Sequence, residues 1–265
     1  MNIGIVGCAG RMGRMLLKHV IEHEAAELAG GTERMGSEAI DQDLGTLAGL
    51  KPINMPVTGD TKALFEASDA VIDFTIPAAT RDHAKLAVET GTALVIGTTG
   101  LDGKDFEAID EAAEMVAIVQ AGNMSVGVNL LCGLVEKVAG VLGDEFDIEV
   151  LEMHHRHKID APSGTALMLG ESAAQGRAVN LADVSQRVRD GQTGARRAGD
   201  IGFATLRGGG VVGEHTVIFA SEDERIEIAH KASDRGLFAS GAVRAALWCH
   251  GRAAGRYSMR DVLGL

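Results

Sequence analysis

Short apolar runs alternate with amphipathic stretches through the first half of the chain. The runs at residues 70–72 and 94–96 contain no polar side chain, which is typical of parallel strands that helices cover on both faces. Such alternation favours βαβ units and a parallel sheet. The pattern predicts strands over Asn2–Gly7, Ala26–Glu33, Ala70–Thr75, Ala93–Ile96 and Met115–Gln120, and helices over Gly10–His23, Ala78–Thr90 and Asp102–Ala113.

The pattern changes after Met124. Three apolar runs near the end follow one another with only turn-like breaks, which indicates antiparallel or mixed strand pairing. We expect strands over Phe146–Met153, Ile201–Arg207, Val211–Ser221 and Arg225–Lys231, and helices over Val126–Leu142, Thr165–Gln175 and Leu237–His250. The charged stretch Leu181–Gly199 is expected to be a mobile loop. The fold class is therefore α/β, with a parallel-sheet domain and a second, α+β domain.

A glycine-rich segment joins the first predicted strand to the first predicted helix. Glycines at such a turn let the backbone approach a pyrophosphate, and the helix start offers its N–H groups to the anion. The segment has the form G-x-x-G-x-x-G and consists of Gly7, Cys8, Ala9, Gly10, Arg11, Met12 and Gly13. Ala9 stands where the usual fingerprint has its middle glycine, and a purely structural turn is the alternative interpretation.

The end of the second predicted strand strengthens the dinucleotide interpretation. Glu33 lies 20 residues after Gly13, where a dinucleotide site places the acid that binds the ribose hydroxyls. Arg34 follows at once, and its guanidinium suits a 2′-phosphate or the adenine face. An acid and an arginine side by side predict tolerance of both NAD and NADP.

Two further turns follow predicted strands at the same edge of the sheet. In an open parallel sheet, ligands bind at the carboxyl ends of the strands. Each turn alone is typical of an ordinary βα connection, but with the first motif we expect both to line the cofactor cleft. They comprise Gly97, Thr98 and Thr99, and Ala121, Gly122, Asn123 and Met124.

The segment from Glu152 to Thr165 concentrates basic and titratable residues in an acidic protein. If the preceding strand runs on, His154, Arg156 and Lys158 share one face, and crowded cations release protons more easily. The following residues, Ser163, Gly164 and Thr165, are typical of a helix start that holds a carboxylate. Together they predict a cationic pocket for an anionic substrate, with a proton donor inside it.

Two other interpretations of this segment stay open. One is a solvated run of charges with no chemistry. The other is a metal site built from His155, His157 and Asp160, which lacks an obvious fourth ligand.

Composition and charge narrow the classes of function. The 265 residues carry a formal net charge of −12 and only 3% aromatic side chains, which argues against nucleic acid as a partner. The uncharged run Met115–Val135 is interrupted by polar residues and glycines, so we interpret it as a strand, a turn and a buried helix rather than a membrane span. Three unpaired cysteines and the absence of a basic leader indicate a reduced, cytoplasmic protein.

These motifs resemble the 4-hydroxy-tetrahydrodipicolinate (dihydrodipicolinate) reductase family of bacterial and plant lysine biosynthesis. The similarity runs nearly end to end and is most specific over residues 154–158 and 160–165. It implies a Rossmann-like nucleotide domain over 1–124 and 235–265, with a substrate-binding and oligomerisation domain over 125–234. It further implies a homotetramer that uses NADH or NADPH to reduce a cyclic dicarboxylate, with loss of water, and needs no metal.

The resemblance also implies roles for individual residues. His154 would donate or accept a proton, Lys158 would donate the other, and His155, Ser163, Gly164 and Thr165 would bind the substrate. Glu33 and Arg34 would meet the adenosine half of the cofactor, and the turns at 97–99 and 121–124 its nicotinamide half. Because His154 and His155 cannot face the same way on a regular strand, we expect the strand to end there or one of them to reach in from a loop.

Other functions remain as alternatives. One is a different two-domain dehydrogenase acting on a small amino or dicarboxylic acid. Another is a non-enzymatic NADH sensor, and a third is a metal-dependent hydrolase that uses the histidines.

Overall fold

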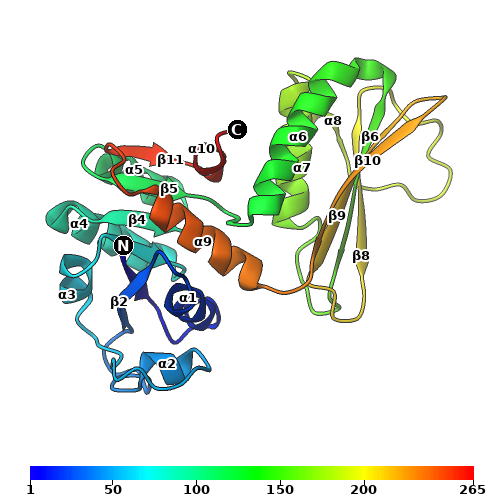
Figure 1. The fold of residues 1–265 in the computed structure, drawn as a ribbon. Coiled ribbons are helices and arrows are strands. Elements are labelled where there is room, and N and C mark those ends of the chain that lie inside the picture. Colours follow the sequence, from blue (N-terminus) through cyan, green and yellow to red (C-terminus); the bar gives the residue numbers. More distant parts are fainter. The chain divides into compact units, whose positions relative to one another are not determined.

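The structure, a computed structural model, describes residues 1–265 as two compact units. The first unit consists of Met1–Val126 and Gly236–Gly264, and the second of Gly127–Arg235 and Leu265. The chain therefore leaves the first unit after its fifth strand and returns to it with a late helix (Figure 1). Each unit has its own sheet.

The first unit contains a six-stranded sheet in the order β11-β5-β4-β3-β1-β2, and every pairing in it is parallel. The predicted parallel sheet is thus confirmed. Its strands are β1 (Asn2–Val6), β2 (Glu27–Thr32), β3 (Ala70–Asp73), β4 (Ala93–Ile96), β5 (Ala117–Gln120) and β11 (Gly255–Tyr257).

Helices cover both faces of this sheet (Figure 1). On β3, Ile72 packs into one buried cluster with residues of α1 and α9, whereas its neighbour Val71 packs into another with residues of α4 and α5. Apolar side chains at successive positions of the strand are therefore all buried, because they point to opposite faces of the sheet and helices cover both faces. The helices are α1 (Arg11–Ile21), α2 (Leu44–Leu47), α3 (Thr61–Glu66), α4 (Pro77–Thr90), α5 (Gly103–Ala113), α9 (Gly236–Trp248) and α10 (Met259–Leu263).

The second unit contains a five-stranded mixed sheet in the order β10-β9-β6-β8-β7. Its central strand pairs parallel with β8 and antiparallel with β9, which confirms the predicted mixed pairing. The strands are β6 (Asp147–His154), β7 (Ser185–Gln186), β8 (Ile201–Arg207), β9 (Gly213–Ala220) and β10 (Arg225–Ala232).

Two long helices, α6 (Val126–Leu142) and α7 (Gly164–Gly176), pack on one face of the second sheet. Residues alternate between buried and half-buried along β6 and β9, as expected of strands with one covered face. The segment Val126–Glu145 is long and apolar enough to cross a membrane by length and composition only. Val128, Leu131 and Val135 of this segment lie in the buried cluster of the second unit, so α6 serves as a core helix.

Several short elements differ from the expectations. The stretch Leu181–Gly199, expected to be a loop, begins with helix α8 (Leu181–Val184) and strand β7. Asp43 and Asp60 cap α2 and α3, neither of which was predicted. A 3₁₀ turn at Gly143–Glu145, strand β11 and helix α10 were also missed. Four of these seven elements have three or four residues, and two-residue β7 exists only through pairing with its neighbour.

Candidate functional site

The glycine-rich segment lies where β1 ends and α1 begins. Gly7 has a φ of +65°, and a Cβ on Gly13 would lie 2.2 Å from the carbonyl oxygen of Gly7, so neither position accepts a side chain without rearrangement. Gly10 caps α1 without a side-chain hydrogen bond, and the first turn has no acidic residue. The N–H groups at this helix start are thus available to an anion, and the helix dipole favours one there.

Glu33 and Arg34 come directly after β2 and lie beside this turn. Oε1 of Glu33 accepts a hydrogen bond from the backbone N–H of Ala9 at 3.0 Å. A cavity of about 330 Å³ adjoins both, and Gly7, Glu33, Arg34 and Thr75 contribute to its wall. A cavity lined by a carboxylate and a guanidinium, next to the glycine turn that leads into an uncapped helix start, fits the adenosine and pyrophosphate of a dinucleotide.

A buried aspartate at the end of β3, which was not predicted as a site residue, connects the neighbouring turns. Asp73 Oδ1 accepts hydrogen bonds from Thr75 Oγ1 at 2.6 Å and Thr98 Oγ1 at 3.1 Å, and Oδ2 lies 2.8 Å from His83 Nδ1. Burial raises the pKa of Asp73, but the hydrogen bonds of His83 and Thr75 outweigh it and hold that pKa below its usual value. The available signal was a single polar residue at the end of an apolar run.

The two further cofactor turns take different positions. Thr98 is buried in the Asp73 network, whereas Thr99 is exposed. Asn123 Oδ1 accepts from the backbone N–H of Ser125 at 2.8 Å. Met124 is buried in the core of the first unit, and a Cβ on Gly241 of α9 would lie 1.8 Å from its carbonyl oxygen. Its thioether therefore packs inside the unit rather than along its surface.

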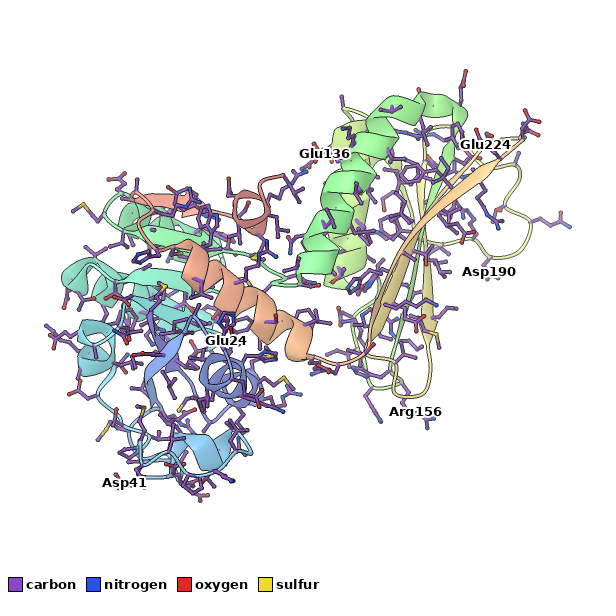
Figure 2. All side chains as sticks on the ribbon, viewed as in Figure 1. Glu24, Asp41, Glu136, Arg156, Asp190 and Glu224 are labelled. Atoms are coloured by element: carbon purple, nitrogen blue, oxygen red, sulfur yellow. The ribbon has the colours of Figure 1, made fainter.

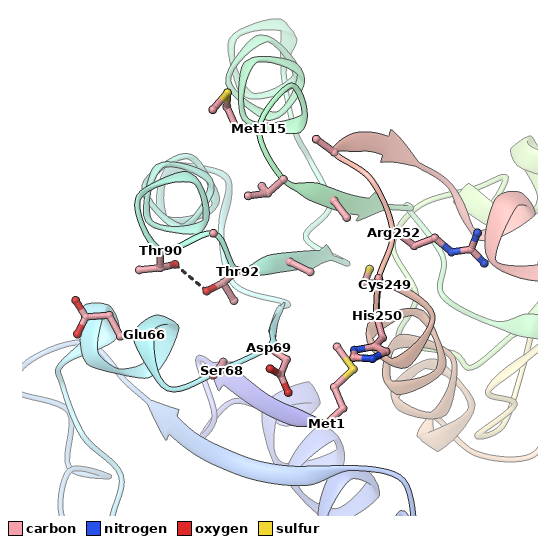
Figure 3. Close-up of a pocket in the computed structure, with 16 residues that line it drawn as sticks. Met1, Glu66, Ser68, Asp69, Thr90, Thr92, Met115, Cys249, His250 and Arg252 are labelled. Carbon is pink, nitrogen blue, oxygen red and sulfur yellow. Dashed lines mark hydrogen bonds between the residues drawn. The ribbon is translucent and has the colours of Figure 1, made fainter.

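A second cavity of the first unit, of about 350 Å³, lies at the amino ends of the strands (Figure 3). Its wall includes Asp69 and Thr92, which directly precede β3 and β4. The glycine turn follows the carboxyl end of β1, so this cavity lies at the opposite edge of the sheet. Cys249 in its wall is buried, and burial raises the pKa of its thiol to about 12, which leaves it unreactive.

In the second unit, β6 ends at His154, and the following residues form a turn. The expectation that His154, Arg156 and Lys158 share one strand face is therefore wrong, because the strand does not run on. Arg156 lies exposed at the end of the sheet (Figure 2). The ammonium of Lys158 lies 2.8 Å from Asp160 Oδ1. The alternative expectation, that the strand ends between His154 and His155, is confirmed.

The buried carboxylate of Glu152 contacts the imidazole of His154. Glu152 Oε2 lies 2.6 Å from His154 Nδ1, and the guanidinium of Arg207 on β8 donates to both carboxylate oxygens at 2.7 and 2.9 Å. Oε1 also accepts from the backbone N–H of Ser163 at 3.0 Å. Burial raises the pKa of Glu152, but the bonds of Arg207 and His154 outweigh it, so that pKa lies below its usual value. Neither Glu152 nor Arg207 stands out in the sequence as a site residue.

Ser163 caps α7, which confirms the predicted helix start. Its Oγ accepts from the backbone N–H of Ala166 at 3.1 Å and lies 3.1 Å from Nε2 of His215 on β9. The ring of His215 meets His154 edge-on, with centroids 5.1 Å apart. Burial and the neighbouring His154 lower the pKa of His215 to about 4, so this imidazole is neutral near pH 7.

The remaining candidates lie around this cluster. Gly164 is exposed and Thr165 half-buried at the start of α7, whose first turn has no acidic residue. Burial and the Arg235 charge lower the pKa of His155. No three His, Cys, Asp or Glu side chains are arranged to hold a metal ion, so the structure does not bring His155, His157 and Asp160 together as ligands.

Comparison with known proteins identifies the family. The family description "Dihydrodipicolinate reductase, N-terminus" matches residues 1–124, and "Dihydrodipicolinate reductase, C-terminus" matches residues 127–263. The chain belongs to the dihydrodipicolinate reductase family. It is therefore an oxidoreductase that uses NADH or NADPH, as the glycine turn and Glu33 predicted.

Relatives in this family are similar over their whole length. The 4-hydroxy-tetrahydrodipicolinate reductase of Parvibaculum lavamentivorans is 56% identical over 265 residues, covering all of this chain and 98% of the relative. That of Brucella melitensis is 53% identical over 266 residues, covering all of this chain and 99% of the relative. The dipicolinate-bound dihydrodipicolinate reductase of Paenisporosarcina sp. TG-14 superposes with a TM-score of 0.76 at 21% identity, covering 98% of each chain, which confirms the fold.

Proposed function

We propose that this chain reduces 4-hydroxy-tetrahydrodipicolinate to tetrahydrodipicolinate with NADH or NADPH, with loss of water, in lysine and diaminopimelate biosynthesis. Relatives of that name at 53–56% identity over the whole chain support the substrate. The observation that carries the chemistry is the cluster at the end of β6. There, a buried carboxylate joins a histidine to a helix start, which places a proton-exchanging group beside an anion-binding one.

The first unit would bind the nucleotide. The N–H groups at the start of α1, in the turn from Gly7 to Gly13, would hold the pyrophosphate. Glu33 would accept hydrogen bonds from the adenine-side ribose, and Arg34 would face a 2′-phosphate. Residues 97–99 and 121–124 would line the nicotinamide half, Met124 through its backbone, since its side chain is buried. When bound, the reduced nicotinamide supplies the hydride.

The second unit would hold the dicarboxylate substrate. Ser163, Gly164 and Thr165 at the start of α7 would receive one carboxylate, since the first turn carries no acidic residue to repel it. His155 would add a further polar contact. Removal of the substrate hydroxyl as water requires a proton, which His154 would deliver from Nε2 because Nδ1 is committed to Glu152. Lys158, half-buried beside Asp160, would be the second proton donor.

The second sheet also supports a homotetramer. Met153 on β6 and Leu206 on β8 are register partners on the face that α6 and α7 do not cover, and Leu151 on β6 and Ile218 on β9 lie on the same face. Leu206 is 48% exposed. An uncovered sheet face that carries such apolar side chains among polar ones is typical of an interface between subunits. With reduced cysteines, we place the assembled enzyme in the cytoplasm.

A coupled assay tests the proposed function. The upstream synthase generates the substrate from pyruvate and aspartate semialdehyde, and loss of nicotinamide absorbance is followed with NADH and with NADPH. Oxidation that requires every component supports the function. Oxidation of neither nucleotide would contradict it, and the same result with intact nucleotide binding would favour a sensor.

A further inference from the structure

Glu152 lies two residues before the proposed proton donor and is 1% exposed. Its carboxylate receives hydrogen bonds from Arg207 and from the backbone N–H of Ser163, and Thr205 Oγ1 lies 3.5 Å from Oε1. A carboxylate that Arg207 contacts through both oxygens is ionised and can only accept hydrogen bonds. The 2.6 Å contact between Glu152 Oε2 and His154 Nδ1 must therefore be a hydrogen bond that the Nδ1–H group of His154 donates.

We propose that Glu152 is a positioning residue for the reduction, which sets the tautomer of His154 and fixes the start of α7 beside it. The inference rests on the proposed function, because it assigns Glu152 to the same site. Its first consequence concerns the proton. With Nδ1 holding its proton against Glu152, a neutral His154 has a bare Nε2, and a protonated one carries its labile proton there. Nε2 is thereby fixed as the nitrogen that exchanges protons with the substrate.

The second consequence concerns the carboxylate-binding turn. Oε1 of Glu152 accepts from the backbone N–H of Ser163, the residue that caps α7. The same side chain thus sets the distance between His154 and the N–H groups that would hold the substrate carboxylate. A substrate held by one group and protonated by the other needs that distance to be constant.

Arg207 and Gly213 lie next to Glu152 and His154 and help to fix their positions. Arg207 balances the charge of Glu152 and also donates to the carbonyl oxygen of Asp160 at 2.7 Å, which ties the turn after His154 to the sheet. Gly213 on β9 lies beside the ring of His154, and a Cβ there would lie 3.0 Å from Nε2. The absence of a side chain at Gly213 keeps the exchanging nitrogen uncrowded.

Glu152→Gln tests the proposal with nearly no change of shape. All partners of Glu152 are donors, whereas Gln offers one oxygen and one NH₂ group. If the NH₂ group faces His154, it donates to Nδ1 and moves the imidazole proton to Nε2. We expect kcat to fall by roughly 10²–10⁴-fold, as loss of a positioned acid or its tautomer does, with the affinity for NADH unchanged.

Glu149→Gln is the matched control. Glu149 lies on the same strand but points to the opposite face, where Arg189 contacts it at 2.7 and 2.8 Å and Arg196 at 3.0 Å. It is thus another arginine-paired carboxylate of β6, without a contact to His154. We expect its kcat to stay within about twofold of the wild type. A loss of kcat equal to that of Glu152→Gln would overturn the proposal, because any arginine-paired carboxylate of β6 would then suffice.

An NMR measurement reads the tautomer without relying on activity. In ¹⁵N-labelled protein, at a pH where the imidazole is neutral, His154 should carry its proton on Nδ1 in the wild type and on Nε2 in Glu152→Gln. The His154→Gln spectrum assigns the signals. A wild-type signal of the Nε2–H form would overturn the proposal, and so would a Glu152→Gln kcat near the wild-type value. If the wild type oxidises no nucleotide in the coupled assay, the proposed function fails instead, and the tautomer remains measurable.

Glu152→Asp covers the case in which Glu152→Gln does not fold. It keeps the charge for Arg207 but withdraws the carboxylate by about one C–C bond, roughly 1.5 Å. We expect a kcat at least roughly tenfold lower than that of the wild type, with NADH affinity unchanged. A folded Glu152→Asp protein with wild-type kcat would contradict the positioning role.

Discussion

The backbone N–H of Ala9 donates to the Glu33 carboxylate at 3.0 Å, although the two residues are 24 positions apart in the chain. This bond joins the turn after β1 to the residue after β2, the two segments that a dinucleotide spans. A carboxylate accepts several hydrogen bonds. Glu33 can therefore order the glycine turn and hold a ribose at the same time.

Glu33→Ala should weaken NADH binding more than NADPH binding. NADH offers the ribose hydroxyls that Glu33 would accept from, whereas the 2′-phosphate of NADPH would be held by Arg34. Loss of a charged hydrogen bond costs roughly 1.5–3 kcal/mol, which corresponds to roughly 10–150-fold in the dissociation constant for NADH. Isothermal titration with each nucleotide measures it.

Two further variants control that experiment. Glu27→Ala removes an exposed acid at the other end of β2 and should leave both affinities unchanged. Arg34→Ala should weaken NADPH more than NADH. Equal weakening of both nucleotides by Glu33→Ala would show that Glu33 acts only by ordering the turn through Ala9.

The sequence predicted those parts of the fold that local patterns determine. Strand β4 is apolar throughout, and β3 is apolar up to its last residue, because both faces of the sheet are covered, and such runs are visible in a window of four residues. Strand β11 is different. Gly255–Tyr257 becomes a strand by pairing with β5, which lies more than 130 positions earlier in the chain, and its own composition contains no such signal.

The same distinction applies to the candidate site. The start of α7 was predictable because Ser163 and its helix are adjacent in sequence. The ion pair between Glu152 and Arg207 was not predictable from the sequence. Arg207 lies 55 positions away and reaches Glu152 only through the parallel pairing of β6 with β8. The shared face of His154 and Lys158 was predicted wrongly, because period-two counting presumes a strand that in fact ends at His154.

A planar aromatic dicarboxylate should inhibit competitively against the substrate. Pyridine-2,6-dicarboxylate presents a carboxylate that the start of α7 would bind through Gly164 and Thr165. Ser163→Ala removes the cap of that helix, which costs roughly 1 kcal/mol of stability, and should raise the inhibition constant and the KM for the substrate. Steady-state kinetics at varied substrate and varied nucleotide separate the two binding sites. Competition with the nucleotide alone would place the anion site elsewhere.

The stability of the protein should fall as the pH drops from 6.5 toward 4, in part because of His215. Its pKa is lowered from 6.5 to about 4 in the folded chain, so between these values the unfolded chain binds a proton that the folded chain does not. The contribution of His215 to the free energy of unfolding is therefore fully present above pH 6.5. It decreases on acidification, by at most roughly 1.4 kcal/mol per pH unit for this group. Carboxylates add little above pH 5, where they are ionised in both states.

Melting temperatures measured from pH 5 to pH 8 test this dependence. His215→Gln should flatten the decrease below about pH 6.5, whatever its effect on the melting temperature at pH 8. The decrease should not vanish, because burial also lowers the pKa of His155 and His230. His157→Gln alters an exposed histidine and should keep the wild-type slope. An unchanged slope in His215→Gln would show that this imidazole is not buried in its neutral form.

His154→Gln tests the proton donor itself. The glutamine keeps an amide near Glu152 but has no group that releases a proton, so turnover should fall by roughly 10²–10⁴-fold, with nucleotide affinity unchanged. Lys158→Met should also lower turnover and should raise the KM, because it removes a cation from the neighbourhood of an anionic substrate. If these residues only stabilised a solvated turn, both variants would lower the melting temperature and leave turnover per folded molecule nearly intact. Turnover, nucleotide affinity and melting temperature on both variants distinguish the two cases, and wild-type turnover in His154→Gln would rule out His154 as the acid.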